Sequence, residues 1–144
     1  MKKILLILIT VFIFSCKNEK TKPTKPNFII GNWIRINNKK GSVTYETWNK
    51  NLKGLGYTLK EKDTAFKEKL SFVTLKDTLF LKVEGVNETP TLFRITNQTD
   101  TSFVAENKNN EFPKKILYYK DGQFLKAEVS SEDFKIEFIF KNTK

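Results

Sequence analysis

Two glutamates are the residues whose type and position suit chemistry inside this protein. Glu46 and Glu68 each fall on the apolar side of a segment in which polar and apolar residues alternate. Glu46 shares its side with Trp48. Glu68 shares its side with three apolar residues, Phe66, Leu70 and Phe72. Because an unpaired buried carboxylate is costly, each group either lines a solvated ligand cavity or belongs to a buried hydrogen-bond network, unless a bulge turns it outward.

A pair of carboxylates also permits acid–base catalysis, as in glycoside hydrolysis. The chain holds 16 Asp and Glu residues, so one pair is a weak signal, and a carboxylate-based hydrolase is the alternative rather than the expectation. There is no histidine, which removes the usual general base and every Ser–His or Cys–His pair. Acidic residues do not recur at metal-ligand spacing. We therefore expect no enzyme, with no catalytic residue, no metal and no cofactor.

Short alternating segments separated by turn residues predict a protein made almost entirely of strands. The ten expected strands are 29–37, 43–49, 54–62, 65–75, 78–84, 91–97, 101–107, 114–120, 123–130 and 134–141. Any helix should be minor, because no segment sustains the helical period over three turns. Asp121-Gly122 indicates a type I′ hairpin, and Gly54-Leu55-Gly56 a sharp bend within a strand. The expected fold class is all-β, an antiparallel meander of roughly 8–10 strands closed into a barrel that leaves no exposed edge.

The alternation also predicts which side chains face the interior of that barrel. Three sets have inward parity: Phe134, Ile136, Phe138 and Phe140; Leu125, Ala127 and Val129; Leu79, Leu81 and Val83. Three aromatic residues join the two glutamates as candidate ligand contacts: Trp48, Tyr57 and Tyr118. An outward set would instead suit a patch for a partner protein: Phe80, Tyr119, Phe124 and Ile139.

The first sixteen residues indicate where the protein is located. Lys2 and Lys3 precede an apolar run from Ile4 to Phe14, which is shorter than the ~20 residues that a membrane-spanning helix needs. Ser15 then precedes Cys16, the only cysteine of the chain. This ending resembles the lipobox of bacterial lipoproteins, in which the cysteine thiol receives a diacylglycerol. We expect residues 1–15 to be a removable signal peptide and Cys16 to be the lipidation site.

The segment after Cys16 is expected to be a tether to the membrane of the cell envelope. Residues 17–27 carry four lysines and two prolines but no large apolar side chain, so they cannot pack. We take residues 16–27 as lipidated cysteine and flexible tether, and residues 28–144 as the β-barrel domain. The absence of aspartate at positions 17 and 18 favours the outer membrane over the inner membrane.

The net charge of +10 does not indicate a nucleic-acid partner. From Phe28 onward there are 20 lysines and arginines against 15 acidic residues, with both signs mixed along nearly every segment. Only Arg35 and Arg94 are arginines, whereas nucleic-acid sites cluster their basic residues and use arginine heavily. We interpret the excess as a solvated, lysine-rich surface. The sequence leaves the oligomeric state open.

Gly31-Asn32-Trp33, at the start of the first expected strand, resembles the G-x-W signature of lipocalins. The resemblance implies a lipocalin- or calycin-like barrel in which Trp33 plugs one end. It also implies a basic side chain from the last strand above that tryptophan, for which Lys135 and Lys141 are the candidates.

A broader resemblance, to the bacterial DUF6265 domain family, covers nearly the whole domain. The matching segments are 31–33, 46–48, 55–57, Glu68, 93–95 and 106–118. The most specific is Glu106 to Tyr118, which has a Glu-Asn, short spacer, acidic-Phe-Pro, basic, aliphatic, Tyr pattern. This chain has Asn110 where members commonly carry histidine. The resemblance implies a calycin-type barrel and brings no established activity.

Together these observations predict a membrane-anchored bacterial lipoprotein whose barrel binds a small, largely apolar ligand. Glu46 and Glu68 would orient that ligand. The alternative is an envelope interaction or structural lipoprotein whose barrel core is solid. The volume of the interior distinguishes the two hypotheses.

Overall fold

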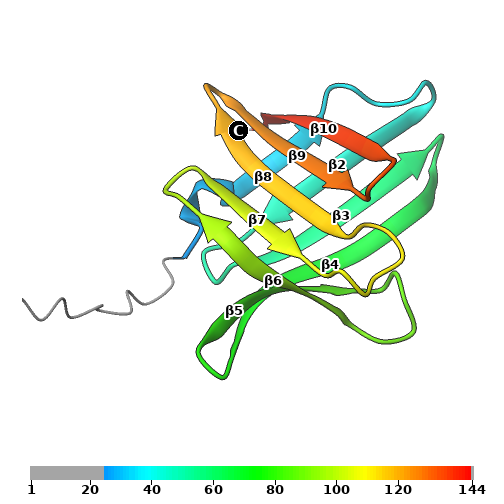
Figure 1. Ribbon diagram of the computed structural model, residues 1–144. Helices are drawn as coiled ribbons and strands as arrows, with labels where there is room; N and C mark the ends of the chain where they lie inside the picture. Colours follow the sequence, from blue (N-terminus) through cyan, green and yellow to red (C-terminus); the bar gives the residue numbers. More distant parts are fainter. Residues whose placement is uncertain (1–24, 144) are drawn as a thin grey trace, which may run out of the picture.

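Ten antiparallel strands close into a barrel in this computed structural model, which describes residues 25–143 (Figure 1). The strands run in sequence order around the barrel, and β1 pairs with β10 to close it. The elements are η1 (Asn27–Ile29), β1 (Gly31–Arg35), β2 (Ser42–Trp48), β3 (Lys53–Lys60), β4 (Asp63–Leu75), β5 (Thr78–Glu84), β6 (Thr91–Gln98), β7 (Ser102–Glu106), β8 (Lys115–Asp121), β9 (Phe124–Ser130) and β10 (Lys135–Asn142). The predicted all-β meander barrel is confirmed.

The expected signal peptide, the lipidation site Cys16 and most of the tether lie outside the described residues. Every strand pair, including the closing pair, lies within them. Residues 17–144 therefore include every strand pair of the barrel and are the segment for the experiments below. Packing begins slightly before the expected domain boundary at Phe28, because Pro26 is already fully buried.

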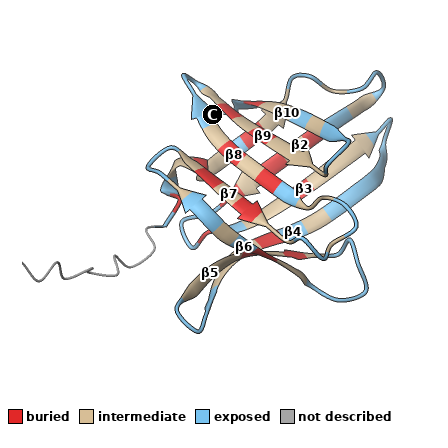
Figure 2. Ribbon diagram, viewed as in Figure 1, coloured by how far each residue is buried: buried red, intermediate tan, exposed pale blue. Residues whose placement is uncertain are grey.

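The predicted alternation is confirmed along most strands, as the bands of buried residues in Figure 2 show. Leu81 and Val83 of β5, Leu125 and Ala127 of β9, and Phe140 of β10 are all buried. The prediction that Phe134 faces the interior is wrong. It precedes β10 and is 58% exposed, because the hairpin turn from β9 still includes it and the alternation starts only at Lys135.

The backbone conformation of the hairpin turns differs from the expected one. The loop between β8 and β9 is Gly122-Gln123, in which only Gly122 has a positive φ (57°). A type I′ turn needs positive φ at both central residues, so the predicted type is wrong, and glycine at the first position suits a type II′ turn. The positive pair occurs instead at Lys76 and Asp77, between β4 and β5 (φ 45° and 60°).

One end of the barrel is closed by η1, where the described chain begins (Figure 1). Ile29 is fully buried there, and the Trp33 indole donates a hydrogen bond from Nε1 to the Ile29 carbonyl at 2.8 Å. Trp33 itself is 4% exposed, at the end expected for a plug. Neither candidate lysine covers it: Lys135 pairs with Glu128 at 3.1 Å, and Lys141 is exposed.

Within residues 25–143, no helix is long and apolar enough to cross a membrane.

Candidate functional site

A cavity of about 360 Å³ occupies the end of the barrel opposite η1. In a meander that starts at η1, the loops after odd-numbered strands all lie at that opposite end. Residues of two such loops border the cavity, Val86 and Asn87 between β5 and β6, and Phe112 between β7 and β8. Val86 and Phe112 are 52% and 38% exposed, so the cavity opens to solvent between these loops. We call this opening the mouth.

The walls of the cavity are mainly apolar and come from both sides of the barrel. They include six inward aliphatic and aromatic residues, Leu70, Leu81, Val83, Phe93, Ile116 and Phe138. Phe66 stands at the mouth and is 43% exposed. Thr44 and Thr58 add a polar pair, with their hydroxyl oxygens 2.9 Å apart. Sequence reasoning missed the two threonines, although their inward parity on β2 and β3 was a usable signal.

The two predicted glutamates face this cavity in one row across three strands. Glu46 of β2 lies opposite Gly56 of β3, and Gly56 lies opposite Glu68 of β4. A Cβ atom on Gly56 would stand 3.0 Å from Glu68 Oε1, so the glycine leaves the room that the Glu68 side chain occupies. Both carboxyl groups are thereby held beside one another at the inner surface.

The expected bend at Gly54-Leu55-Gly56 is not where the strand is irregular. The register of β3 against β4 shifts between Thr58 and Leu59 instead. Gly54 serves close packing, as Gly56 does, because a Cβ atom there would stand 2.8 Å from the Trp48 ring. The glycines are therefore explained by the large side chains that lie over them.

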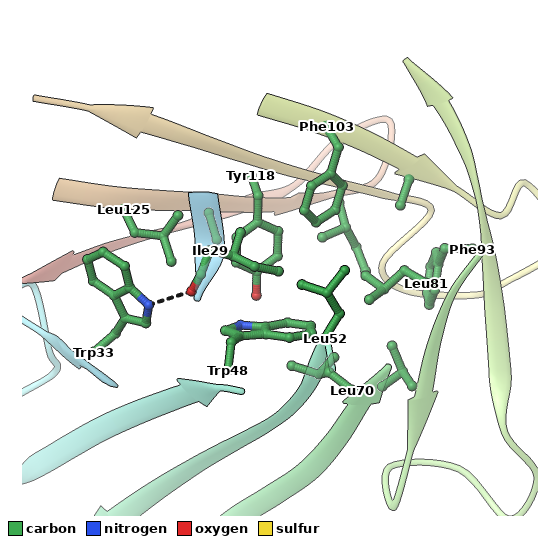
Figure 3. Close-up of a cluster of buried hydrophobic side chains, with 14 of the residues drawn as sticks. Ile29, Trp33, Trp48, Leu52, Leu70, Leu81, Phe93, Phe103, Tyr118 and Leu125 are labelled. Carbon is green, nitrogen blue, oxygen red and sulfur yellow. Dashed lines mark hydrogen bonds between the residues drawn. The ribbon is translucent and has the colours of Figure 1, made fainter. Parts of the chain in front are cut away.

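Glu46 belongs to a buried hydrogen-bond network. Trp48 donates from Nε1 to Glu46 Oε1 at 2.6 Å, and the Tyr118 hydroxyl donates to Glu46 Oε2 at 2.9 Å. Figure 3 shows the Tyr118 hydroxyl and the Trp48 indole converging from opposite walls. Glu46 is only 5% exposed, and both of its oxygens have a donor. The structural alternative considered for Glu46 therefore applies, although the residue also borders the cavity.

Glu68 is different, because it has no hydrogen bond or ion pair with any residue of the described chain. Burial, and after it the charge of Glu46, raise the pKa of Glu68 to about 7. Burial also raises the pKa of Glu46 to about 7, against the opposing effect of its two hydrogen bonds. Those two bonds favour the ionised form of Glu46, and the charge of Glu46 disfavours ionisation of Glu68. Burial and this negative charge raise the pKa of Tyr118 well above its usual value.

The three aromatic candidates occupy different places. Tyr118 is buried and borders the cavity. Trp48 is buried in the packed core, with its ring 5.8 Å from that of Phe72. It is not among the residues that border the cavity. Tyr57 borders the cavity, but the alternation of β3 places it on the other face from Gly56. There its ring stacks on that of Tyr45, with centroids 5.1 Å apart.

The outward aromatic and aliphatic set does not form one patch. Tyr119, Phe124 and Ile139 lie on neighbouring strands β8 to β10, whereas Phe80 lies on β5, beyond β6 and β7. All four are half-buried. Lys126 covers Tyr119, with Nζ 5.8 Å from the ring centroid. The set thus offers less apolar surface than its composition indicates.

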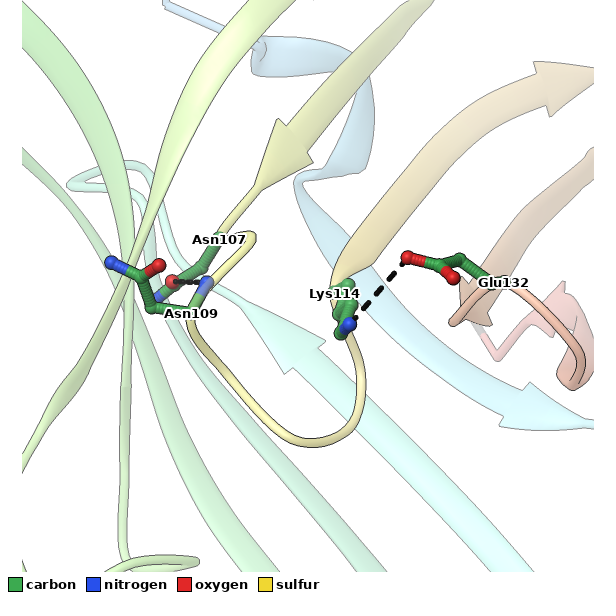
Figure 4. Close-up of polar contacts among 4 residues, drawn as sticks. All are labelled: Asn107, Asn109, Lys114 and Glu132. Carbon is green, nitrogen blue, oxygen red and sulfur yellow. Dashed lines mark hydrogen bonds and ion pairs between the residues drawn. The ribbon is translucent and has the colours of Figure 1, made fainter.

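Two contacts join neighbouring loops at the rim of the mouth. Lys114, after the β7–β8 loop, forms an ion pair with Glu132 of the β9–β10 loop at 3.6 Å (Figure 4). The rings of Phe112 and Phe134 meet between the same loops, with centroids 5.6 Å apart. Asn107 caps the start of the first loop by accepting a hydrogen bond from the backbone of Asn109 at 3.0 Å (Figure 4). The ring contact explains why Phe134 lies at the rim rather than in the core.

Among residues 25–143, no three histidine, cysteine or acidic side chains come together as a metal site would require. No protein-family model matches the chain, and comparisons with curated proteins and with solved structures return no match. The resemblance to the DUF6265 family stays a prediction.

The Tyr118–Glu46 hydrogen bond supports the ionised form of a buried carboxyl group, so Tyr118→Phe should destabilise the barrel. We expect a loss of about 1.5–3 kcal/mol in the free energy of unfolding at pH 8, measured by urea denaturation. The loss should be smaller at pH 5, where the carboxyl is protonated. Tyr119→Phe, one residue along on the outer face, is the matched control and should change stability by less than about 0.5 kcal/mol. Equal losses in both variants would contradict the network.

The raised pKa of Glu68 makes stability depend on pH with a defined sign. Between its ordinary value of 4.5 and the folded value of about 7, the folded protein binds more protons than the unfolded chain. Stability therefore falls as pH rises through this window, by at most about 3 kcal/mol for this group. Glu68→Gln should be more stable than wild type at pH 8 and equal to it near pH 4. Glu137→Gln, on the exposed face of β10, should follow the wild type at both pH values in the same urea titrations.

Proposed function

We propose that this protein is a lipid-anchored lipoprotein of the bacterial cell envelope whose barrel binds a small, largely apolar ligand. The observation that carries the binding proposal is the cavity of about 360 Å³ that opens at the end opposite η1. Small-molecule sites are typically apolar concavities of roughly 300–1,000 Å³ with a few polar groups that fix orientation. Glu68 and the Thr44–Thr58 pair are such groups here.

Binding fits the site better than catalysis does. Each Glu46 oxygen already accepts a hydrogen bond, one from Trp48 and one from Tyr118, and these bonds favour the ionised form and so weaken Glu46 as a base. A solid-cored interaction protein fits less well as an alternative, because it needs neither the cavity nor a half-buried inward carboxyl that makes no hydrogen bond within the described chain.

The place where the chain enters the barrel is compatible with an anchor on Cys16. The described chain begins beside η1, at the closed end, and the mouth lies at the other end. An anchor that precedes η1 would thus join the described barrel at its closed end. The outer membrane is the proposed location.

Lipidation is tested with Cys16→Ser in the full chain, expressed in a bacterium fed a labelled fatty acid. We expect label on the wild-type protein and none on the variant, which should also be lost from the membrane fraction or stay unprocessed. Label that persisted on the variant would defeat the lipoprotein proposal.

Ligand binding is tested with the neutral fluorescent probe N-phenyl-1-naphthylamine and residues 17–144. We expect a saturable increase in fluorescence with one site. Ala127→Leu should weaken binding at least tenfold, because Ala127 is buried at the cavity wall and a larger side chain takes up ligand space. Lys126→Leu, its neighbour on the outer face, is the control and should bind as the wild type does. Unsaturable fluorescence, or equal binding by Ala127→Leu, would contradict a ligand site in the cavity.

A further inference from the structure

The cavity has the opposite electrostatic character to the protein that contains it. From Phe28 onward the chain carries 20 lysines and arginines. Among those that the structure describes, up to Lys141, none borders the cavity, whereas Glu46 and Glu68 both do. The Arg35 guanidinium lies 4.2 Å from the ring of Phe138, which borders the cavity, and it donates a hydrogen bond to the Glu137 carbonyl. The inner surface is therefore acidic inside a basic protein.

The two carboxyl groups of the site also differ in how many hydrogen bonds they accept. Glu46 already receives two donors, and Glu68 receives none from the described residues. What the site lacks is a donor that reaches Glu68 from the cavity. An ammonium group carries three donors, no acceptor and a positive charge, which is the complement of this site.

We propose that the cavity selects an amphipathic amine, whose ammonium head binds Glu68 beside Glu46 and whose apolar body lies against the walls toward the mouth. This inference rests on the proposed ligand-binding function. The apolar walls exclude water from the head group, and a buried ammonium is tolerated only when a carboxylate pairs with it. An anionic amphiphile would place a third acid beside the pair. A neutral alcohol would donate one hydrogen bond to Glu68 without balancing any charge.

Binding of an amine is coupled to loss of a proton from the pair. The pKa of Glu46 and that of Glu68 are both raised to about 7, chiefly by burial, so near neutral pH the empty site keeps a proton. Tyr118, from β8, donates a hydrogen bond to Glu46 and stays neutral because its pKa is raised, and among the described residues Tyr45 and Tyr57 are the other tyrosines that border the cavity. An ammonium ion favours two carboxylates and displaces the proton. The affinity for an amine should therefore increase with pH up to about 7, whereas that for a carboxylic acid should decrease.

Three probes with the same apolar chain test the inference: octylamine, octan-1-ol and octanoate. Their binding to residues 17–144 is measured by isothermal titration calorimetry at pH 6 and pH 8.5. At pH 8.5 we expect octylamine to bind at least tenfold more tightly than octan-1-ol, and octanoate to bind most weakly. The affinity for octylamine should increase at least about tenfold between the two pH values, since at least one proton leaves per amine bound. The basic surface of the protein opposes this order, so it would originate in the cavity.

Glu68→Gln keeps the shape of the side chain and should abolish the preference for octylamine over octan-1-ol. Glu137→Gln, an exposed glutamate on β10, should retain it within twofold. Equal binding of octylamine and octan-1-ol to wild type, or tighter binding of octanoate, would overturn the amine inference while leaving ligand binding intact. Binding of none of the three probes would contradict the proposed function as well. The wild-type pH series distinguishes these outcomes even where a variant fails to fold.

Discussion

The hydrogen bond from Tyr118 to Glu46 is the contact on which the division of the interior depends. It joins β8 to β2, strands that are not neighbours in the barrel, and so it crosses the interior. On the η1 side of this bridge lies a packed core that contains Trp48, Phe72 and Phe103, with ring centroids 5.3–5.8 Å apart. On the other side lies the cavity. The bridge therefore places two polar groups at the level where the packed core meets the cavity.

The bridge also accounts for the two carboxyl groups having unequal roles. Glu46 is held by donors from two walls, which fixes its position and favours its charge. Glu68 receives its position from Gly56, a residue without a side chain, and makes no polar contact within the described chain. One acid is therefore structural and the other is available. Such a pair of unlike environments is how proteins give two chemically identical groups different tasks.

Strand number, order and inner face follow from the sequence because side chains alternate with a period of two and the connections are short. The same parity places Glu46 and Glu68 inside. Parity does not predict contacts across the barrel. Tyr118, which donates a hydrogen bond to Glu46, lies 72 residues from it in the sequence. Trp48, expected to contact a ligand, donates a hydrogen bond to the Glu46 carboxyl group. The prediction for Phe134 is wrong for a related reason, since its partner Phe112 belongs to another loop. The local sequence predicts a bend at Gly54 and Gly56. In the structure these two positions are glycine because large side chains lie directly over them.

Closure of the barrel by β1 and β10 has a consequence for how the chain folds. Nine of the ten strand pairs join neighbours in sequence, and the closing pair joins the first strand to the last. The backbone of Thr143 even donates to the carbonyl of Asn32 at 2.8 Å, beyond the end of the paired strands. The barrel is therefore closed only when its most distant pairing forms, because the entropy lost in bringing β1 and β10 together is recovered only by that pairing.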